Sequence, residues 1–268
     1  MKTILEARHI VKAFKLKKQH LFEKQTFVQA VDHISFQVKE GQTIGIVGES
    51  GSGKSTVSEI IGDLQKPTSG TVKYFGKDIG TMTKEEYQDF RRGVQFVFQS
   101  PKDSLHPFYT IQENLLEPLK VSSSTYNKDD ALKEVTELLG KVNLDESILK
   151  KHPSEISGGQ AQRVAIARAL LLKPKVIICD ECVSALDLSI QAQILDLLKE
   201  LQVEFGTSYV FISHDIGAVY KMSDYVMVMN QGKVLEEGET EQVLLHPEHT
   251  YTKTLIQSSF SIEEDEVV

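Results

Sequence analysis

The sequence predicts an α/β fold with a mostly parallel core sheet, an antiparallel β arm at the N-terminus and an inserted helical part. A glycine-rich turn joins an apolar run at 43–47 to a helical pattern that starts near residue 54. Later in the chain, strand patterns at 176–179 and 208–212 alternate with a helix pattern around 190–203. Such β-α-β alternation is typical of a parallel sheet with helices on both faces.

The first strands are predicted from a different pattern. Apolar and polar residues alternate over 4–14 and 30–38, as in antiparallel strands with one buried face. The Lys-rich segment 14–29 between them is interpreted as a solvated hairpin loop, with contact to an anionic surface as the alternative. Strand patterns follow at 70–74 and 94–98.

Residues 101–153 are polar and helical in pattern, most clearly at 131–139, and we interpret them as a helical insertion in the sheet. The acidic residues 261–266 are expected to form a solvated tail. No internal repeat and no long heptad run is visible.

Composition limits the classes of function. The chain has 268 residues, 40% of them hydrophobic, and can form one large α/β domain or two small ones. A net charge of −8 argues against a nucleic-acid partner. Because no apolar run spans a membrane and charge follows Met1 too soon for a signal peptide, we expect a cytoplasmic protein. The two cysteines fit a reducing compartment.

The glycine-rich turn Gly48-Glu49-Ser50-Gly51-Ser52-Gly53-Lys54-Ser55 is a P-loop between strand and helix. Its backbone N–H groups and the helix N-terminus favour phosphate, Lys54 reaches the outer phosphates, and the Ser55 hydroxyl can hold Mg²⁺. This pattern predicts a nucleoside triphosphate site. The loop residues expected to bind the nucleotide are Gly48, Ser50, Gly51, Gly53, Lys54, Ser55 and Thr56.

An acidic pair follows the strand at 176–179. Asp180 and Glu181 come at the carboxyl end of this strand, at the edge of the sheet where the P-loop also opens. We predict that Asp180 holds Mg²⁺ and that Glu181 orients or deprotonates the attacking water. A surface acidic pair is the alternative, and the buried strand before it argues against that.

Ser157, Gly158, Gly159 and Gln160 precede a helix pattern and form a second turn suited to anions. One site needs only one P-loop, so this turn suggests that two chains share nucleotide across an interface. These residues resemble the signature motif of the ABC transporter ATPases, which closes over the ATP of the opposite subunit. The resemblance covers nearly the whole chain, with the motifs in the expected order.

The resemblance implies further roles. Phe14 matches the aromatic residue that stacks on adenine, Gln99 the Q-loop glutamine, residues 184–187 the D-loop, and His214 the histidine that contacts the γ-phosphate. Taken alone, each of these residues also fits an ordinary structural role, and their joint order favours the functional one. The implied catalytic residues are Glu181, His214 and Gln99, the implied Mg²⁺ ligands are Ser55, Gln99 and Asp180, and Ser157, Gly158, Gly159 and Gln160 are expected to contact the partner's ATP.

Within the ABC family, residues 103–107, 185–193 and 246–252 look like the ATP-binding subunits of oligopeptide, dipeptide and nickel importers. His246 and His249 could bind metal, but in that family their segment is a C-terminal docking element. The chain lacks the longer cysteine-bearing extension of one of the two paired subunits. It therefore looks like the shorter, second subunit of a heterodimeric motor.

One residue departs from the family pattern. Cys182 stands where Pro usually follows the catalytic glutamate, and it creates a Cys179-x-x-Cys182 spacing. A redox pair has this spacing, but strand alternation and the strain of a disulfide in the turn at Glu181 favour structural thiols. Because Cys does not fix φ as Pro does, the stiffness of the turn is in question.

The sequence thus predicts an ATP-hydrolysing motor subunit of an ABC importer on the cytoplasmic face of the membrane, for peptides or, less favoured, for nickel or another metal chelate. The cofactors are ATP and Mg²⁺. Expected partners are a related ATPase subunit, two permeases and, through them, a substrate-binding protein. A non-transport ABC ATPase and a regulatory half that binds ATP without turnover are the rival hypotheses. The predicted domain is 1–245, with a core of 1–99 and 167–245 and a helical subdomain of 100–166, followed by a C-terminal element at 246–268.

Overall fold

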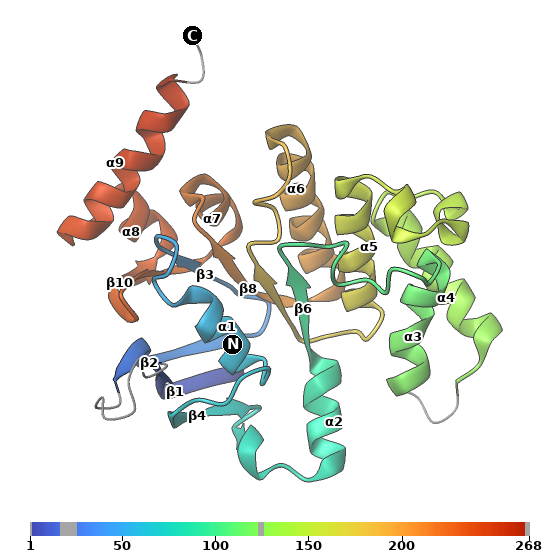
Figure 1. The fold of residues 1–268 in the computed structure, drawn as a ribbon, viewed down its shortest axis with the longest axis horizontal. Coiled ribbons are helices and arrows are strands. Elements are labelled where there is room, and N and C mark those ends of the chain that lie inside the picture. The colour runs from blue at the N-terminus through green and yellow to red at the C-terminus, as the bar shows by residue number, and fades with distance from the viewer. Residues whose placement is uncertain (1, 17–25, 123–125, 266–268) are drawn as a thin grey trace. The chain divides into compact units, whose positions relative to one another are not determined.

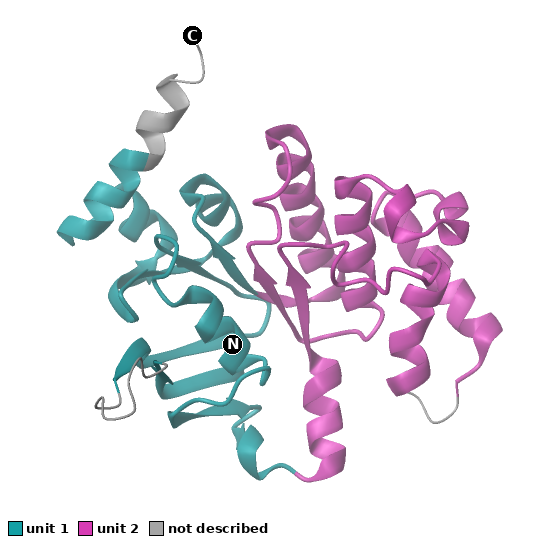
Figure 2. Cartoon of the chain, in the orientation of Figure 1, with its two compact units in different colours: residues 1–82, 210–268 teal, residues 83–209 magenta. Residues whose placement is uncertain are grey.

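The computed structural model describes residues 2–16, 26–122 and 126–265, with side chains described as far as residue 258. The chain divides into two compact units, which Figure 2 colours separately. Unit 1 consists of residues 1–82 and 210–268, and unit 2 of residues 83–209. The predicted boundaries between core, helical subdomain and C-terminal element stay a prediction.

Unit 1 contains the antiparallel arm, a sheet with strand order β2-β1-β4-β5 (Figure 1). Its strands are β1 (Thr3–Lys15), β2 (Phe27–Lys39), β4 (Ser69–Tyr74) and β5 (Lys77–Asp78), with the 3-10 turn η1 (Ile79–Thr81) after them. The antiparallel pairing of β1 with β2 confirms the predicted strands, and each extends further than the alternation indicated. Most of the Lys-rich segment, residues 17–25, lies outside the described residues.

Unit 1 also contains β3 (Thr43–Val47), which pairs in parallel with β9 (Tyr225–Asn230), and β10 (Lys233–Glu239), which pairs antiparallel with β9. All residues of β3 are buried, as expected for an apolar run in a parallel sheet. The helices of this unit are α1 (Lys54–Ile61), α7 (Ile216–Met222), α8 (Thr240–Leu245) and α9 (Thr250–Asp265). Helix α1 packs against β1 and β2, and α7 packs against β3.

Helix α9 continues to Asp265, into the acidic stretch at 261–266. The solvation predicted for this stretch stays a prediction. Charge alone does not end a helix, and this stretch contains no Pro or Gly that would.

Unit 2 pairs β6 (Val94–Phe98) in parallel with β7 (Val176–Asp180), both as predicted. Its helices are α2 (Lys84–Gly93), α3 (Ile111–Ser122), α4 (Lys128–Lys141), α5 (Gly158–Leu170) and α6 (Leu188–Phe205), with 3-10 turns η2 (Glu146–Lys150) and η3 (Pro153–Glu155). Helices α3 and α4 lie in the predicted helical insertion at 101–153 and pack on each other and on α5, in the part drawn in green to yellow in Figure 1. Strand β8 (Ser208–Ser213) begins in unit 2 and ends in unit 1.

Helix α2 is not among the predicted elements, although its start carries a clear signal. Thr83 accepts a hydrogen bond from the N–H of Glu86, whose side chain accepts one from the N–H of Thr83. This reciprocal capping box is readable from the spacing Thr-x-x-Glu. Among the described residues, no helix has both the length and the apolar character needed to cross a membrane.

Candidate functional site

The P-loop of unit 1 runs between buried β3 and helix α1. Gly48 and Gly53 have φ angles of +155° and +104°. A β-carbon at Gly48 would lie 2.1 Å from the carbonyl oxygen of Met229, and one at Gly53 would lie 2.3 Å from that of Ala30. Both contacts are with backbone atoms that cannot move aside, so these two positions require glycine.

The loop presents donors for an anion. Lys54 is only 4% exposed, and its Nζ donates to the carbonyl oxygens of Gly48 at 2.7 Å and Glu49 at 2.9 Å. The backbone N–H groups of Gly51 and Gly53 have no hydrogen-bond partner among the described residues. Nothing lies within 4 Å of the place where a β-carbon of Gly51 would be. A buried ammonium beside unpaired N–H groups fits a phosphate chain. Ser50 and Ser55 are exposed and Thr56 is half-buried, on the same loop and helix start.

Two other predicted residues of unit 1 present exposed rings. Phe14, near the end of β1, is 39% exposed, with Lys12 Nζ 5.2 Å from its ring centroid. His214 is exposed in the turn between β8 and α7. That turn is fixed because Asp215 accepts a hydrogen bond from the N–H of Ala218 and caps α7.

In unit 2, the parallel register brings the Q-loop and the acidic pair together. Phe98 of β6 pairs with Asp180 of β7, so Gln99 and Glu181 follow the same edge of this strand pair. The Nε2 of Gln99 donates to Ser184 Oγ at 3.2 Å, and Ser184 Oγ donates to the carbonyl oxygen of Glu181 at 2.9 Å. The D-loop serine thereby links Gln99 to the residue predicted to act as general base.

The turn at Glu181 is held without the usual proline. Glu181 has a φ of +50°, which is uncommon for a residue with a side chain and marks local strain. Its carbonyl accepts from both the N–H of Ser184, at 3.2 Å, and the hydroxyl of the same residue. These two hydrogen bonds hold the turn at Glu181, where Cys182 does not fix φ as a proline would.

Both cysteines are buried, Cys179 at 0% and Cys182 at 1% exposure, and both are free thiols. A hydrogen bond between the two side chains, together with burial, raises the pKa of the Cys179 thiol well above its ordinary value. A protonated, buried thiol is a poor nucleophile and a poor metal ligand, which supports the structural interpretation.

The turn predicted to serve a partner's ATP lies at the N-terminus of α5. Ser157 accepts a hydrogen bond from the N–H of Gln160 at 3.2 Å, and the Gln160 side chain accepts from the N–H of Ser157 at 3.1 Å. A β-carbon at Gly159 would lie 2.8 Å from Ile190 Cγ2, so glycine lets α5 approach α6 closely. Ser157 and Gly158 are exposed. The helix start is thus rigid and open at the surface of unit 2.

The loop between Gln99 and α3 is held by the buried side chain of Asn114 and the half-buried side chain of Arg168, which the sequence gives no reason to single out. Asn114, 2% exposed, accepts from the N–H of His106 at 2.7 Å and donates to the carbonyl oxygens of His106 and Tyr109. Arg168 of α5 donates to the carbonyl oxygen of Ser104 at 2.7 Å. The loop projects Phe108, which is 84% exposed.

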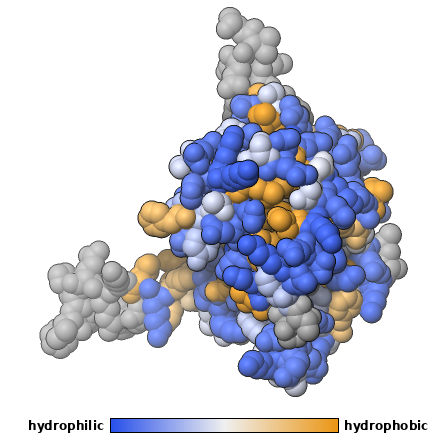
Figure 3. All heavy atoms as spheres, turned by 90° about the vertical axis from the view of Figure 1, so that its right-hand side faces the viewer, coloured by the Kyte–Doolittle hydropathy of each residue, from blue (hydrophilic) through white to orange (hydrophobic). Residues whose placement is uncertain are grey.

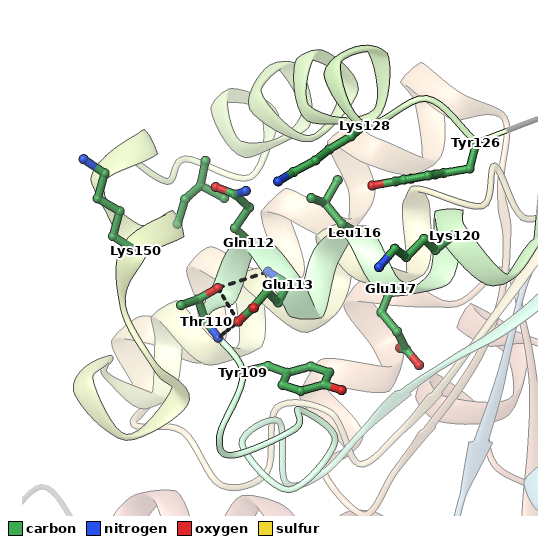
Figure 4. A pocket seen from close by; sticks show the side chains of 11 residues that line it. Tyr109, Thr110, Gln112, Glu113, Leu116, Glu117, Lys120, Tyr126, Lys128 and Lys150 are labelled. Carbon is green, nitrogen blue, oxygen red and sulfur yellow. Dashed lines mark hydrogen bonds between the residues drawn. The ribbon is translucent and has the colours of Figure 1, made fainter.

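Beside this loop lies a hollow of about 570 Å³ in the helical part of unit 2 (Figure 4). Lys120, Lys128 and Lys150 lie along its rim, and the Thr110–Glu113 hydrogen bonds fix its floor. Figure 3 faces the helical part of unit 2 and shows an apolar patch surrounded by hydrophilic surface.

The sequence model of the ABC transporter family matches residues 31–184, more than half of the chain. The chain belongs to the ABC transporter family. It is 43% identical, over 96% of its length and 78% of the relative's, to the oligopeptide transport ATP-binding protein OppF of Salmonella typhimurium. It is 44% identical, over the same shares, to AppF of Bacillus subtilis, also named an oligopeptide transport ATP-binding protein.

Solved structures show the same fold. The dimeric post-hydrolysis structure of the ATP-binding cassette MJ0796, bound to ADP and Pi, superposes with a TM-score of 0.78 and 32% identity, covering 88% of this chain and 99% of that one. CbiO1 of Clostridium perfringens, part of the ABC transporter complex cbiONQ, gives a TM-score of 0.77 at 27% identity, covering 98% and 100%. The predicted ABC cassette fold and ATPase class are confirmed.

Proposed function

We propose that this chain is the ATP-hydrolysing motor subunit of an importer for oligopeptides or dipeptides. The observation that carries the proposal is the similarity, over nearly its whole length, to relatives named oligopeptide transport ATP-binding proteins. A relative from Pseudomonas aeruginosa named di/tripeptide transport ATP-binding protein DppF, 38% identical over 99% of the chain, supports the same substrate class. The nickel or metal-chelate alternative has no such relative among these.

The site residues divide the chemistry between binding and hydrolysis. Lys54 and the N–H groups of the P-loop neutralise the phosphates, and Phe14 stacks on the base. Ser55, Gln99 and Asp180 are the residues that would hold Mg²⁺, an ion that keeps several waters and needs only one or two carboxylates. When bound, Mg²⁺ neutralises charge on the phosphate oxygens.

Glu181 accepts a proton from the attacking water, and Ser184 and Gln99 keep its turn in place. His214 donates to an oxygen of the γ-phosphate. Ser157, Gly158, Gly159 and Gln160 contact ATP held by a second ATPase subunit, as the exposed start of α5 allows.

The partners follow from this role. We propose a heterodimer with a related ATPase, bound to two permeases on the cytoplasmic face of the membrane and served by a substrate-binding protein. The loop that projects Phe108, with the hollow beside it, is the surface that we assign to a permease.

The test is Glu181→Gln in the assembled complex. The amide keeps the shape of the side chain but cannot accept the proton, so phosphate release should fall about 10²- to 10⁴-fold while ATP is still bound. Glu200→Gln, an exposed change on α6, is the matched control and should hydrolyse ATP like the wild type. Phosphate release by Glu181→Gln within about threefold of wild type would show that Glu181 is not the base.

Substrate class is tested with the same complex. ATP hydrolysis should be stimulated by the substrate-binding protein loaded with short peptides and not by the same protein supplied with nickel alone. The reverse result would favour the metal-chelate alternative.

A further inference from the structure

The C-terminal element of unit 1 is tied to strand β10 by one carboxylate. Glu236 accepts hydrogen bonds from the N–H groups of Glu248 at 2.8 Å and His249 at 3.2 Å. Both donors belong to the turn that leads into α9. The carboxylate therefore fixes where α9 begins.

The first turn of α9 reaches the P-loop. The N–H of Tyr251 donates to His249 Nδ1 at 3.1 Å, which orients the start of the helix. The Tyr251 hydroxyl oxygen accepts a hydrogen bond from the N–H of Glu49 at 3.3 Å, across 202 residues of sequence. Burial raises the pKa of the Tyr251 hydroxyl, so this oxygen stays a neutral phenol near pH 7.

The peptide group that carries the Glu49 N–H has the carbonyl of Gly48 at its other end. This carbonyl oxygen accepts a hydrogen bond from Lys54 Nζ at 2.7 Å. In the next peptide group, the Glu49 carbonyl oxygen accepts from Lys54 Nζ at 2.9 Å and from the N–H of Ser52 at 3.2 Å. Lys54 is the buried lysine of the proposed nucleotide site. Tyr251 and Lys54 thus bind opposite ends of one peptide group, and the hydroxyl limits how that peptide can tilt.

We propose that Tyr251 is a positioning residue for the P-loop, acting on Lys54 through the peptide group between Gly48 and Glu49 without touching the nucleotide. The inference rests on the proposed nucleotide site and adds to it a role for the C-terminal element. Without the hydroxyl, the first turn of the loop loses a hydrogen bond that holds it in place, and part of the free energy of ATP binding is used to order the loop. The chain therefore binds both ATP and ADP more weakly, because the whole loop is affected.

The experiment is Tyr251→Phe in the full chain, which keeps the ring and removes only the hydroxyl. Titration calorimetry with Mg-ATP and with Mg-ADP should give dissociation constants about 3- to 10-fold above wild type, as expected for the loss of one neutral hydrogen bond. In the assembled complex, KM for ATP should rise by a similar factor while kcat changes less than about twofold. Hydrogen exchange at the Glu49 amide should become faster.

Tyr220→Phe is the matched control, because Tyr220 lies on α7 with 42% exposure and makes no hydrogen bond to the P-loop in the described residues. It should bind both nucleotides like the wild type. A wild-type chain that fails to bind Mg-ATP would count against the proposed function. If the Tyr251→Phe chain binds Mg-ATP and Mg-ADP with wild-type affinity, the positioning role is overturned. This holds even if the variant has a lower melting temperature.

If Tyr251→Phe does not fold, Glu236→Gln serves as the second variant. It removes the charge that fixes the start of α9 and should weaken binding of Mg-ATP in the same direction. Unchanged affinity in a folded Glu236→Gln chain would likewise overturn the inference.

Discussion

Asn114 is the buried amide that helps to hold the segment after the Q-loop, so Asn114→Leu is an informative change. Leucine has a similar volume but no polar atoms. The substitution removes the bond from the His106 N–H at 2.7 Å and the bonds donated to the carbonyl oxygens of His106, Tyr109 and Thr110 at 3.2, 3.3 and 3.0 Å.

The magnitude follows from the geometry. The amide has two N–H groups for three carbonyls, so it makes about three effective hydrogen bonds in all, each with a net contribution of about 1 kcal/mol. Because Asn114 is 2% exposed, water does not reach the backbone groups that lose their hydrogen bonds to its side chain. We expect the free energy of unfolding to fall by about 2–4 kcal/mol.

The assay is equilibrium unfolding of the full chain in urea. Gln112→Leu, on the same helix and without a side-chain hydrogen bond in the described residues, is the control and should change stability by less than about 0.5 kcal/mol. In the assembled complex, Asn114→Leu should uncouple ATP hydrolysis from transport more than it weakens ATP binding. A loss of stability below about 0.5 kcal/mol would refute the assignment of Asn114 as the residue that orders this loop.

Three further outcomes are expected. Ser184→Ala removes the hydroxyl between Gln99 and the Glu181 carbonyl, so phosphate release by the complex should fall about 3- to 10-fold, and an unchanged rate would show that the D-loop bond is not needed. In the native chain both buried thiols should resist a disulfide reagent at pH 8 and react after unfolding, and fast labelling of the folded chain would contradict the burial and the raised pKa of Cys179. For Glu236, burial opposes ionisation, but N–H bonds from Glu248 and His249 outweigh it and hold the pKa below 4.5. Its contribution to stability is therefore present above pH 4.5 and lost as the pH falls through the lower folded pKa, so the stability difference between wild type and Glu236→Gln should shrink in acid and would be constant if the carboxylate were unpaired.

Local patterns in the sequence determined much of this protein. The strand at 43–47 is an apolar run whose burial follows from its composition, and Gly48 and Gly53 mark a turn that only glycine can form there. The parallel strands at 94–98 and 176–180 could likewise be predicted from their apolar sequence patterns. Each of these features is set by residues close together in the chain, so the pattern of side chains is enough to predict them.

Tertiary structure decided the contacts that support the site. The bond from Gln99 to Ser184 spans 85 residues, and that from Glu49 to Tyr251 spans 202. Asn114 sits in an ordinary helical pattern, and nothing near it in sequence shows that its amide holds a loop. A hydrogen bond between distant segments depends on the register of strands and the packing of helices, which place donor and acceptor within about 3 Å only once the chain has folded.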